Sequence, residues 1–271
     1  MARQELTPKD GPPIDNAVFD LLADEWWEEE AFLHTLRSIV NPWRVPFFRR
    51  KLAELGVDPQ GLRALDVGCG GGLLTEEFEA MGFAVTGIDP SIGSLAVAWD
   101  HAAARGLRID YGAAVGERLP FRDGTFDVVY CCDVLEHVAD WQAVVGESAR
   151  VLRRGGAFLF ETLNRTRKSR LIAIRAAQQW RCTRLFPPNF HRWEMFITPE
   201  ELRHALARHG LLHLETVGGK PRLGLLRSYL LLRRLKKGRI SQAEFGRRLH
   251  LQESRDLSVS YAGCAVKPDG P

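Results

Sequence analysis

Short apolar runs alternate with amphipathic stretches through the middle of the chain. The apolar run 64–67 leads into a glycine cluster at 68–72, and an amphipathic stretch at 73–81 precedes a β-type run at 84–88. Apolar positions that recur with the helical period indicate a surface helix, whereas short apolar runs between turn signals indicate buried strands. Strand, glycine loop, helix and strand in this order predict a βαβ unit and a parallel sheet.

The same alternation continues toward the C-terminus. Further helices are predicted at 91–105, 140–152 and 198–210, and further strands at 108–111, 126–131, 156–161, 211–217 and 257–266. We therefore expect an α/β fold with a doubly wound, mostly parallel sheet of seven strands.

Two helices are predicted before the first strand. One covers 16–39 and mixes apolar side chains with an acidic run, and the other covers 45–55, with Asn41 and Pro42 separating them. The expected organisation is an N-terminal helical cap at 1–60, a core with the glycine loop at 61–163, and the second half of the same domain at 164–271, with basic helical insertions near 165–190 and 220–250.

Composition excludes several classes of protein. The chain is 45% hydrophobic and 26% charged, which is typical of a globular protein rather than a disordered or fibrous one. No apolar run approaches the roughly 18 residues of a membrane span. Residues 1–11 lack the apolar centre of a secretory signal, and five cysteines without paired spacing indicate reduced thiols. We expect a cytoplasmic protein.

The glycine cluster predicts a nucleotide-type ligand. Glycines at 68, 70 and 72 let backbone N–H groups approach a ligand without a Cβ in the way. Asp89 ends the next strand, where doubly wound folds place an acid for ribose hydroxyls. Asp66 lies just before the loop, where it can organise the loop or meet an ammonium group. Leu73 occupies the position of the third glycine of the dinucleotide fingerprint, which disfavours a nicotinamide oxidoreductase.

These segments resemble the class I S-adenosylmethionine-dependent methyltransferases. Residues 65–72 look like their first motif, 86–89 like the strand with the ribose-binding acid, and 117–121 with 126–129 like the adenine-side loop and fourth strand. The resemblance implies S-adenosylmethionine as the methyl donor. It implies a donor site formed by Arg44, Asp66, Gly68, Cys69, Gly70, Asp89, Pro90, Gly116, Glu117 and Cys132.

A narrower resemblance is to the ubiquinone-biosynthesis O-methyltransferases. It rests on 25–27, 41–44, 162–169 and 191–202, and more weakly on 256–261. This resemblance implies a phenolic or catechol-type acceptor, such as a polyprenylated quinone precursor. It places Asn164, Lys168, His191 and Trp193 on the acceptor side. The segment 219–250 is longer than is usual in that family, which keeps a small-molecule N- or O-methyltransferase of secondary metabolism open as an alternative.

Polar residues follow the predicted strand 126–131. A phenol has a pKa near 10 and must lose its proton to attack well at neutral pH. Either a histidine base or a bound divalent cation can bring this about, so His137 and Glu136 are the catalytic candidates. The resemblance implies that Asp133, Glu136 and His137 hold a divalent cation such as Mg²⁺, for which hard oxygen ligands are suitable.

The net charge of +3 conceals an uneven distribution. Acids concentrate at 20–30, whereas 165–186 and 220–250 combine many cations with apolar side chains. Basic amphipathic segments are typical of elements that dock on anionic membranes, so peripheral membrane association is a hypothesis beside an ordinary solvated basic face. Nucleic acid is not expected as a partner, because no nucleic-acid-binding motif is present. A catalytically silent membrane-surface protein is a further, weaker alternative.

Overall fold

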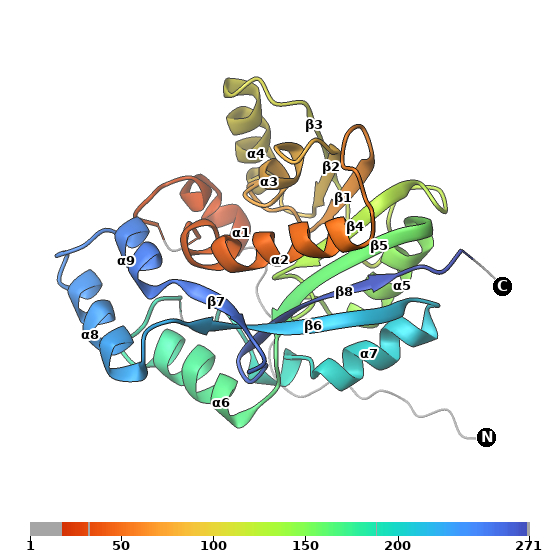
Figure 1. Cartoon of the computed structure of the whole chain (residues 1–271). Helices are drawn as coiled ribbons and strands as arrows, with labels where there is room; N and C mark the ends of the chain where they lie inside the picture. Colours follow the sequence, from red (N-terminus) through yellow and green to blue (C-terminus); the bar gives the residue numbers. More distant parts are fainter. Residues whose placement is uncertain (1–17, 32, 188, 270–271) are drawn as a thin grey trace.

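A computed structural model describes residues 18–31, 33–187 and 189–269 (Figure 1). A single sheet of eight strands runs through it in the order β3-β2-β1-β4-β5-β8-β6-β7. The strands are β1 Arg63–Val67, β2 Ala84–Asp89, β3 Ile109–Ala113, β4 Phe126–Cys132, β5 Leu152–Leu163, β6 Leu212–Pro221, β7 Leu251–Ser254 and β8 Ser260–Val266. Strands β1 to β5 pair in parallel, and β8 is antiparallel to both β5 and β6.

The predicted α/β fold is confirmed, with one strand more than the seven expected. The additional strand is β7, which pairs antiparallel with the end of β6 over Gly218 to Pro221. These four residues follow the second basic segment directly, in a stretch for which the sequence predicted no strand. Pairing with an existing sheet edge, rather than local pattern, makes this segment a strand.

Helices pack on both faces of the sheet. The α-helices are α1 Val18–Leu21, α2 Asn41–Glu54, α3 Thr75–Glu79, α4 Ile92–Ala104, α5 Trp141–Val151, α6 Arg167–Ser169, α7 Pro199–Arg208, α8 Leu225–Lys236 and α9 Gln242–Leu249. Short 3₁₀ turns are η1 Ala23–Trp26 and η4 Trp193–Met195, and π-helical segments are η2 Leu36–Val40 and η3 Arg170–Gln179. None of the helices in the described part of the chain is long and apolar enough to cross a membrane.

Alternating side chains of β4 divide the core into two layers. Val129 faces one side, where it belongs to a buried cluster with Val144 of α5. Val128 faces the other side and joins Phe48 of α2 and Phe78 of α3. Because neighbouring residues of a strand point to opposite faces, a continuous apolar run is what a strand covered on both faces requires. Because β1 to β5 run parallel, their carboxyl ends lie at one common edge of the sheet.

The N-terminal helical prediction is partly wrong. Residues 16 and 17 lie outside the described residues, and 18–39 form α1, η1 and η2 rather than one helix. The indole Nε1 of Trp26 donates to Ser94 Oγ at 2.9 Å, and that of Trp27 donates to the carbonyl of Gly71 at 2.8 Å. Because the two neighbouring indoles bond to different segments, the chain here does not continue as one regular helix. Helix α2 also begins earlier than predicted, because Pro42 is tolerated in its first turn, where a backbone N–H has no helical partner.

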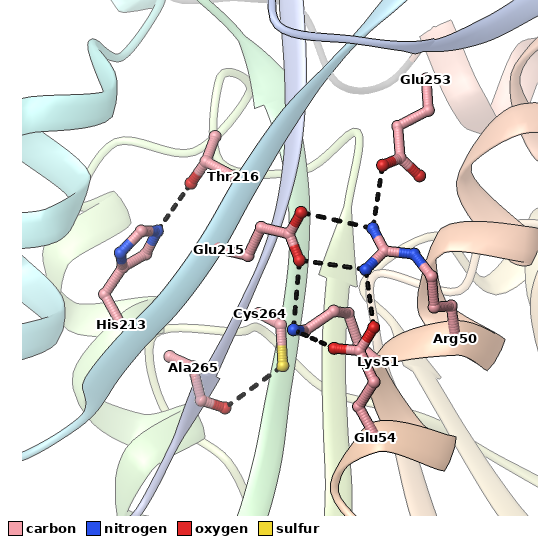
Figure 2. A network of polar contacts seen from close by, with 9 residues as sticks. All are labelled: Arg50, Lys51, Glu54, His213, Glu215, Thr216, Glu253, Cys264 and Ala265. Atoms are coloured by element: carbon pink, nitrogen blue, oxygen red, sulfur yellow. Dashed lines mark hydrogen bonds and ion pairs between the residues drawn. The ribbon is translucent and has the colours of Figure 1, made fainter.

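Helix α2 is tied to the far edge of the sheet by a network of ion pairs (Figure 2). The guanidinium of Arg50 contacts Glu54 at 2.8 Å, Glu215 of β6 at 3.1 Å and Glu253 of β7 at 2.9 Å. The ammonium of Lys51 contacts Glu54 at 2.6 Å and Glu215 at 3.1 Å. Exposed pairs contribute little singly, but this network fixes which face of α2 meets the sheet. The opposite side of the first turns of α2 is therefore directed toward the carboxyl ends of the strands.

Candidate active site

The glycine loop and Asp89 form one rigid unit. The N–H groups of Gly68 and Cys69 both donate to the carbonyl of Ile88, at 2.8 and 2.9 Å. The Asp89 carboxylate accepts from the N–H of Gly70 at 2.9 Å and from the N–H of Ser91 at 2.8 Å. Gly68 and Gly70 have φ of 77° and 50°, a region that favours glycine. The loop is thereby held in place at the ends of β1 and β2, with lone pairs of Asp89 left for a ligand.

Asp66 is buried at the end of β1. Its carboxylate accepts a hydrogen bond from Thr75 Oγ1 at 2.7 Å, and only 2% of the residue is exposed. Burial raises the pKa of this carboxyl to about 7, because removal from water penalises the charged form. A cationic ligand beside Asp66 would restore the charged form, which is the behaviour expected of a site for an ammonium group.

A cavity of about 660 Å³ opens at the carboxyl ends of β1, β2, β4 and β5. Of the residues predicted for the site, its lining includes Arg44, Asp66, Gly68, Cys69, Gly70, Asp89, Pro90, Gly116, Glu117, Cys132, Asp133, Glu136, His137 and His191. The sequence placed these residues in separate motifs, and the fold brings them to one space. This is the position at which doubly wound folds bind ligands.

Three residues predicted for the acceptor side lie outside the cavity lining. Asn164 Nδ2 donates to the carbonyl of Leu257 at 2.7 Å, and Lys168 Nζ pairs with Asp256 at 2.7 Å. Trp193 Nε1 donates to the backbone at Thr166, at 2.8 Å. The first two contacts hold the segment after β5 against the segment before β8, and the third joins η4 to the segment after β5.

Residues of the N-terminal segment cover the glycine loop. A Cβ on Gly70 or Gly71 would come within 2.5 or 2.2 Å of the Trp26 side chain, which shows how closely the indole lies on the loop. Asp20 Oδ1 accepts from Ser91 Oγ at 2.6 Å and anchors α1 beside α4. The sequence singled out the tryptophan pair only as part of a family signature. Its role as a cover follows from contacts between residues far apart in the chain.

Arg44 lies at the floor of the cavity in an acidic cluster. Its guanidinium forms an ion pair with Asp133 and a second one with Glu161 at 3.3 Å, and its Nε donates to Asn41 Oδ1 at 2.9 Å. The side chain of Arg44 is 3% exposed and that of Glu161 4%. Burial and the neighbouring Asp133 raise the pKa of Glu161 well above its usual range. Glu161, near the end of β5, was not predicted as a site residue, because its apolar neighbours in sequence mark it only as part of a strand.

The predicted divalent-cation site is not supported. Asp133 faces Arg44, and the carboxylate of Glu136 accepts from Thr162 Oγ1 at 2.7 Å. The ring of His137 instead packs edge-on against Phe19 and Phe190. Within 18–31, 33–187 and 189–269, no three His, Cys, Asp or Glu side chains are grouped so that they could hold a metal ion. The three predicted ligands therefore do not fit a shared cation.

Aromatic side chains surround His137 in the wall of the cavity. The ring centroid of His137 lies 5.7 Å from that of Phe19, 5.4 Å from that of Phe190 and 5.0 Å from that of His191. Phe186 stacks on Phe190 with their centroids 5.7 Å apart. Burial lowers the pKa of His137 to about 4, so this imidazole is neutral at neutral pH.

The donor half of the cavity fits S-adenosylmethionine. Asp89 lies at the place of a ribose-binding acid, Asp66 is suited to an ammonium group, and residues of the glycine loop line the same cavity. Fold and site together define the class of the protein as the S-adenosylmethionine-dependent methyltransferases. In agreement, the family model of a methyltransferase domain matches residues 65–160.

Two curated relatives define the family more narrowly. The ubiquinone biosynthesis O-methyltransferase of Rhizobium leguminosarum bv. trifolii is 40% identical over 200 residues, which cover 71% of this chain and 78% of the relative. That of Caulobacter vibrioides is 41% identical over 203 residues, which cover 72% and 79%. The chain belongs to the family of the ubiquinone biosynthesis O-methyltransferases, as the sequence motifs predicted.

Solved structures share the fold at low sequence identity. A SAM-dependent methyltransferase from Thermotoga maritima superposes with a TM-score of 0.58 at 17% identity and covers 92% of this chain and 98% of its own. One from Aquifex aeolicus gives a TM-score of 0.54 at 15% identity, with 86% and 93% covered. These likenesses confirm the predicted fold class.

Proposed function

We propose that this O-methyltransferase methylates a phenolic oxygen of an aromatic acceptor that carries a hydrocarbon chain, as a polyprenylated quinone precursor does. The observation that carries the proposal is the two-sided cavity. One half is formed by the glycine loop, Asp66 and Asp89, and the other by His137 within aromatic side chains.

The donor half of the cavity positions the methyl donor, and the acceptor half activates the phenolic oxygen. Bound S-adenosylmethionine supplies an electrophilic methyl group on a sulfonium, whose C–S bond breaks as the acceptor oxygen bonds to the methyl carbon. Asp66 and Asp89 would hold its ammonium and ribose hydroxyls, and Trp26 would exclude water above the loop. In a displacement of this kind, holding the reactants in line provides much of the acceleration.

His137 is the candidate base on the acceptor side. Because burial keeps its imidazole neutral, a ring nitrogen has a lone pair for the phenolic proton. The carboxylate of Asp133, which favours the protonated ring, would stabilise the imidazolium that forms. The proton thus moves from the acceptor oxygen to His137, and the oxygen gains the electron pair that forms the new C–O bond.

The cavity also has an apolar side. Leu36 and Val40 of η2, Ala173 of η3 and Leu251 of β7 belong to its lining. These apolar side chains suit a hydrocarbon substituent of the acceptor, since burial of such a chain is favourable in proportion to its apolar area. This supports an acceptor with an alkyl or polyprenyl chain over a small polar metabolite.

Replacement of His137 by asparagine tests the proposal. We expect kcat with a catechol carrying a short prenyl chain to fall by about 10²–10⁴-fold, while S-adenosylhomocysteine affinity is unchanged. His204→Asn, at an exposed position of α7, is the matched control. Mass spectrometry identifies the methylated atom. Methylation of amines but not phenols would refute the proposal in favour of an N-methyltransferase, and full activity of His137→Asn would refute the base.

Helix α8 supports peripheral association with an anionic membrane, as a second part of the proposal. Leu226, Tyr229 and Leu230 share one face and are 71%, 43% and 51% exposed. The opposite face, with Leu231 and Leu235, packs in a cluster with residues of α9 and η2. Exposed cations surround the outer face and form no ion pair within the described residues, namely Arg227, Arg233, Arg234, Lys236 and Lys237. Apolar side chains bordered by cations suit lipid headgroups and the acyl boundary below them.

Helices α8 and α9 lie together at one end of the molecule (Figure 1). Co-sedimentation with phosphatidylglycerol-containing vesicles tests the docking. We expect binding that Leu226→Ser with Leu230→Ser reduces about tenfold or more, because two leucines no longer enter the boundary. Arg248→Gln on α9, where Glu244 already neutralises the arginine, should bind as the wild type does. Equal binding of all variants, or none by the wild type, would contradict docking through α8.

A further inference from the structure

Helix α4 carries an apolar stripe at the rim of the molecule, beside the edge strand β3 (Figure 1). The α4 stripe consists of Ile92, Ala96, Trp99 and Ala103. Ile92 and Trp99 are 64% and 60% exposed, and both alanines are exposed as well. Positions i, i+4, i+7 and i+11 lie on one side of an α-helix, so the four side chains form a continuous line.

The other sides of α4 are packed within the molecule. The helix contacts β2, β3, α1 and η1, and its residues Leu95 and Ala98 are buried. Leu21 of α1 is exposed next to the N-terminal end of the α4 stripe, because Asp20 Oδ1 accepts from the N–H of Gly93 at 3.2 Å. Large apolar side chains that are exposed together, rather than scattered singly, mark an interaction surface.

The order of large and small side chains along the α4 stripe fits a second copy of the same stripe. From Ile92 to Ala103 the side chains are large, small, large and small. In an antiparallel pair of α4 helices around a two-fold axis, position 92 can face 103 while position 96 faces 99. Each large side chain then meets an alanine of the other copy, which gives the close packing of a protein interior. A parallel pair would instead place one Trp99 against the other.

The two ends of α4 carry opposite charges. Asp20 and Asp24 are exposed beside the N-terminal end, whereas Arg105 and Arg108 are exposed at and after the C-terminal end. Arg105 contacts Glu76 at 3.5 Å, and half of its side chain remains exposed. Antiparallel pairing brings the acidic end of one copy beside the basic end of the other. Charge complementarity therefore favours the same orientation as the side-chain sizes do.

We propose that the α4 stripe joins two copies of this enzyme in an antiparallel, two-fold dimer. The dimer is independent of the proposed acceptor, because none of the four stripe residues lines the cavity. A helix of 13 residues is about 20 Å long, so two such helices bury less than the roughly 1,200 Å² at which stable complexes begin. The dimer is consequently weak, with a dissociation constant on the order of 10–100 µM.

Sedimentation velocity of the full chain, at about 2–200 µM, tests the dimer. The wild type should pass from monomer to dimer over this range. Ile92→Ser with Trp99→Ser should raise the dissociation constant about tenfold or more, because the two large side chains no longer pack on the alanines. Leu226→Ser with Leu230→Ser, which changes the exposed apolar face of α8, is the matched control and should dimerise as the wild type does. Unchanged affinity for S-adenosylhomocysteine shows that each variant is folded.

Exchanging the large and the small position tests the antiparallel pairing itself. Ala96→Trp alone places two indoles against each other and should raise the dissociation constant about tenfold or more. Adding Trp99→Ala restores a large side chain opposite an alanine, so the double variant should return to within about threefold of wild type.

Three results would overturn the proposal. They are a wild type that stays monomeric at the highest concentration, a dimer that Ile92→Ser with Trp99→Ser leaves intact, and a dimer that Ala96→Trp strengthens. If the wild type is monomeric and Ile92→Ser with Trp99→Ser abolishes its binding to phosphatidylglycerol-containing vesicles, the α4 stripe belongs to a membrane surface instead.

Discussion

Replacing Arg44 by methionine removes the positive charge that this residue places at the floor of the cavity. Methionine keeps most of the apolar stem, so the change isolates the guanidinium from the packing of α2. In the wild type this group faces Asp133, Glu161 and the amide of Asn41. Its loss leaves two carboxyl groups facing each other in a poorly hydrated place.

The magnitude follows from the burial of the three partners. Side-chain exposures are 3% for Arg44, 4% for Glu161 and 27% for Asp133. Breaking a buried ion pair by removing one partner costs roughly 3–5 kcal/mol. Asp133 keeps some access to water through the cavity, and Glu161 can take up a proton. We therefore expect the lower end, a loss of about 3 kcal/mol in the free energy of unfolding.

Urea unfolding at pH 7, followed by circular dichroism, measures this loss. Arg50→Met is the matched control on the same helix, because Arg50 pairs with carboxylates at a site that is 38% exposed. There we expect about 1 kcal/mol or less. Adding Glu161→Gln to Arg44→Met should recover part of the stability, since one buried acid is neutralised. Equal losses in the two arginine variants would refute the assignment of Arg44 to a buried ionic cluster.

Three further outcomes are expected. Without a ligand, the carboxyl of Asp66 has a pKa of about 7, so binding of the donor at lower pH must displace a proton. The affinity for S-adenosylmethionine, measured by calorimetry, should therefore rise from pH 6 to pH 8. Asp66→Asn should abolish this dependence on pH. Gly71→Ala places a Cβ 2.2 Å from the Trp26 side chain. We expect a lower melting temperature, with a loss of about 1–3 kcal/mol in stability, and a lower affinity for the donor. An unchanged affinity would argue against Trp26 as a cover of the loop. Tyr261→Phe removes the 3.0 Å hydrogen bond to the carbonyl of Ile197 and should cost about 1 kcal/mol in urea unfolding without changing kcat.

Much of the donor site could be predicted because its signals are local. The run 64–67, the glycines and Asp89 lie within 26 consecutive residues that form one βαβ unit, and the structure shows that unit as predicted. The acceptor side rests on motifs whose contacts lie farther apart. Lys168 and Trp193 belong to the family motifs, yet they are not in the cavity lining and contact Asp256 and the backbone of Thr166. A motif shows which residues matter together, but not which of them touch the ligand.

Local signals in the sequence predict the strands and helices of 63–161, the glycine loop and the acid that accompanies it, because periodicity and turn chemistry act between near neighbours. The packing of distant segments sets which side chains meet. It brings Arg44 to Asp133 and Glu161, so Asp133 pairs with an arginine rather than sharing a cation with Glu136 and His137. It also lays Trp26 over the loop and His191 beside His137. Ion pairs and ring contacts of this kind join residues distant in sequence, and their partners are fixed only when the sheet and its covering segments pack.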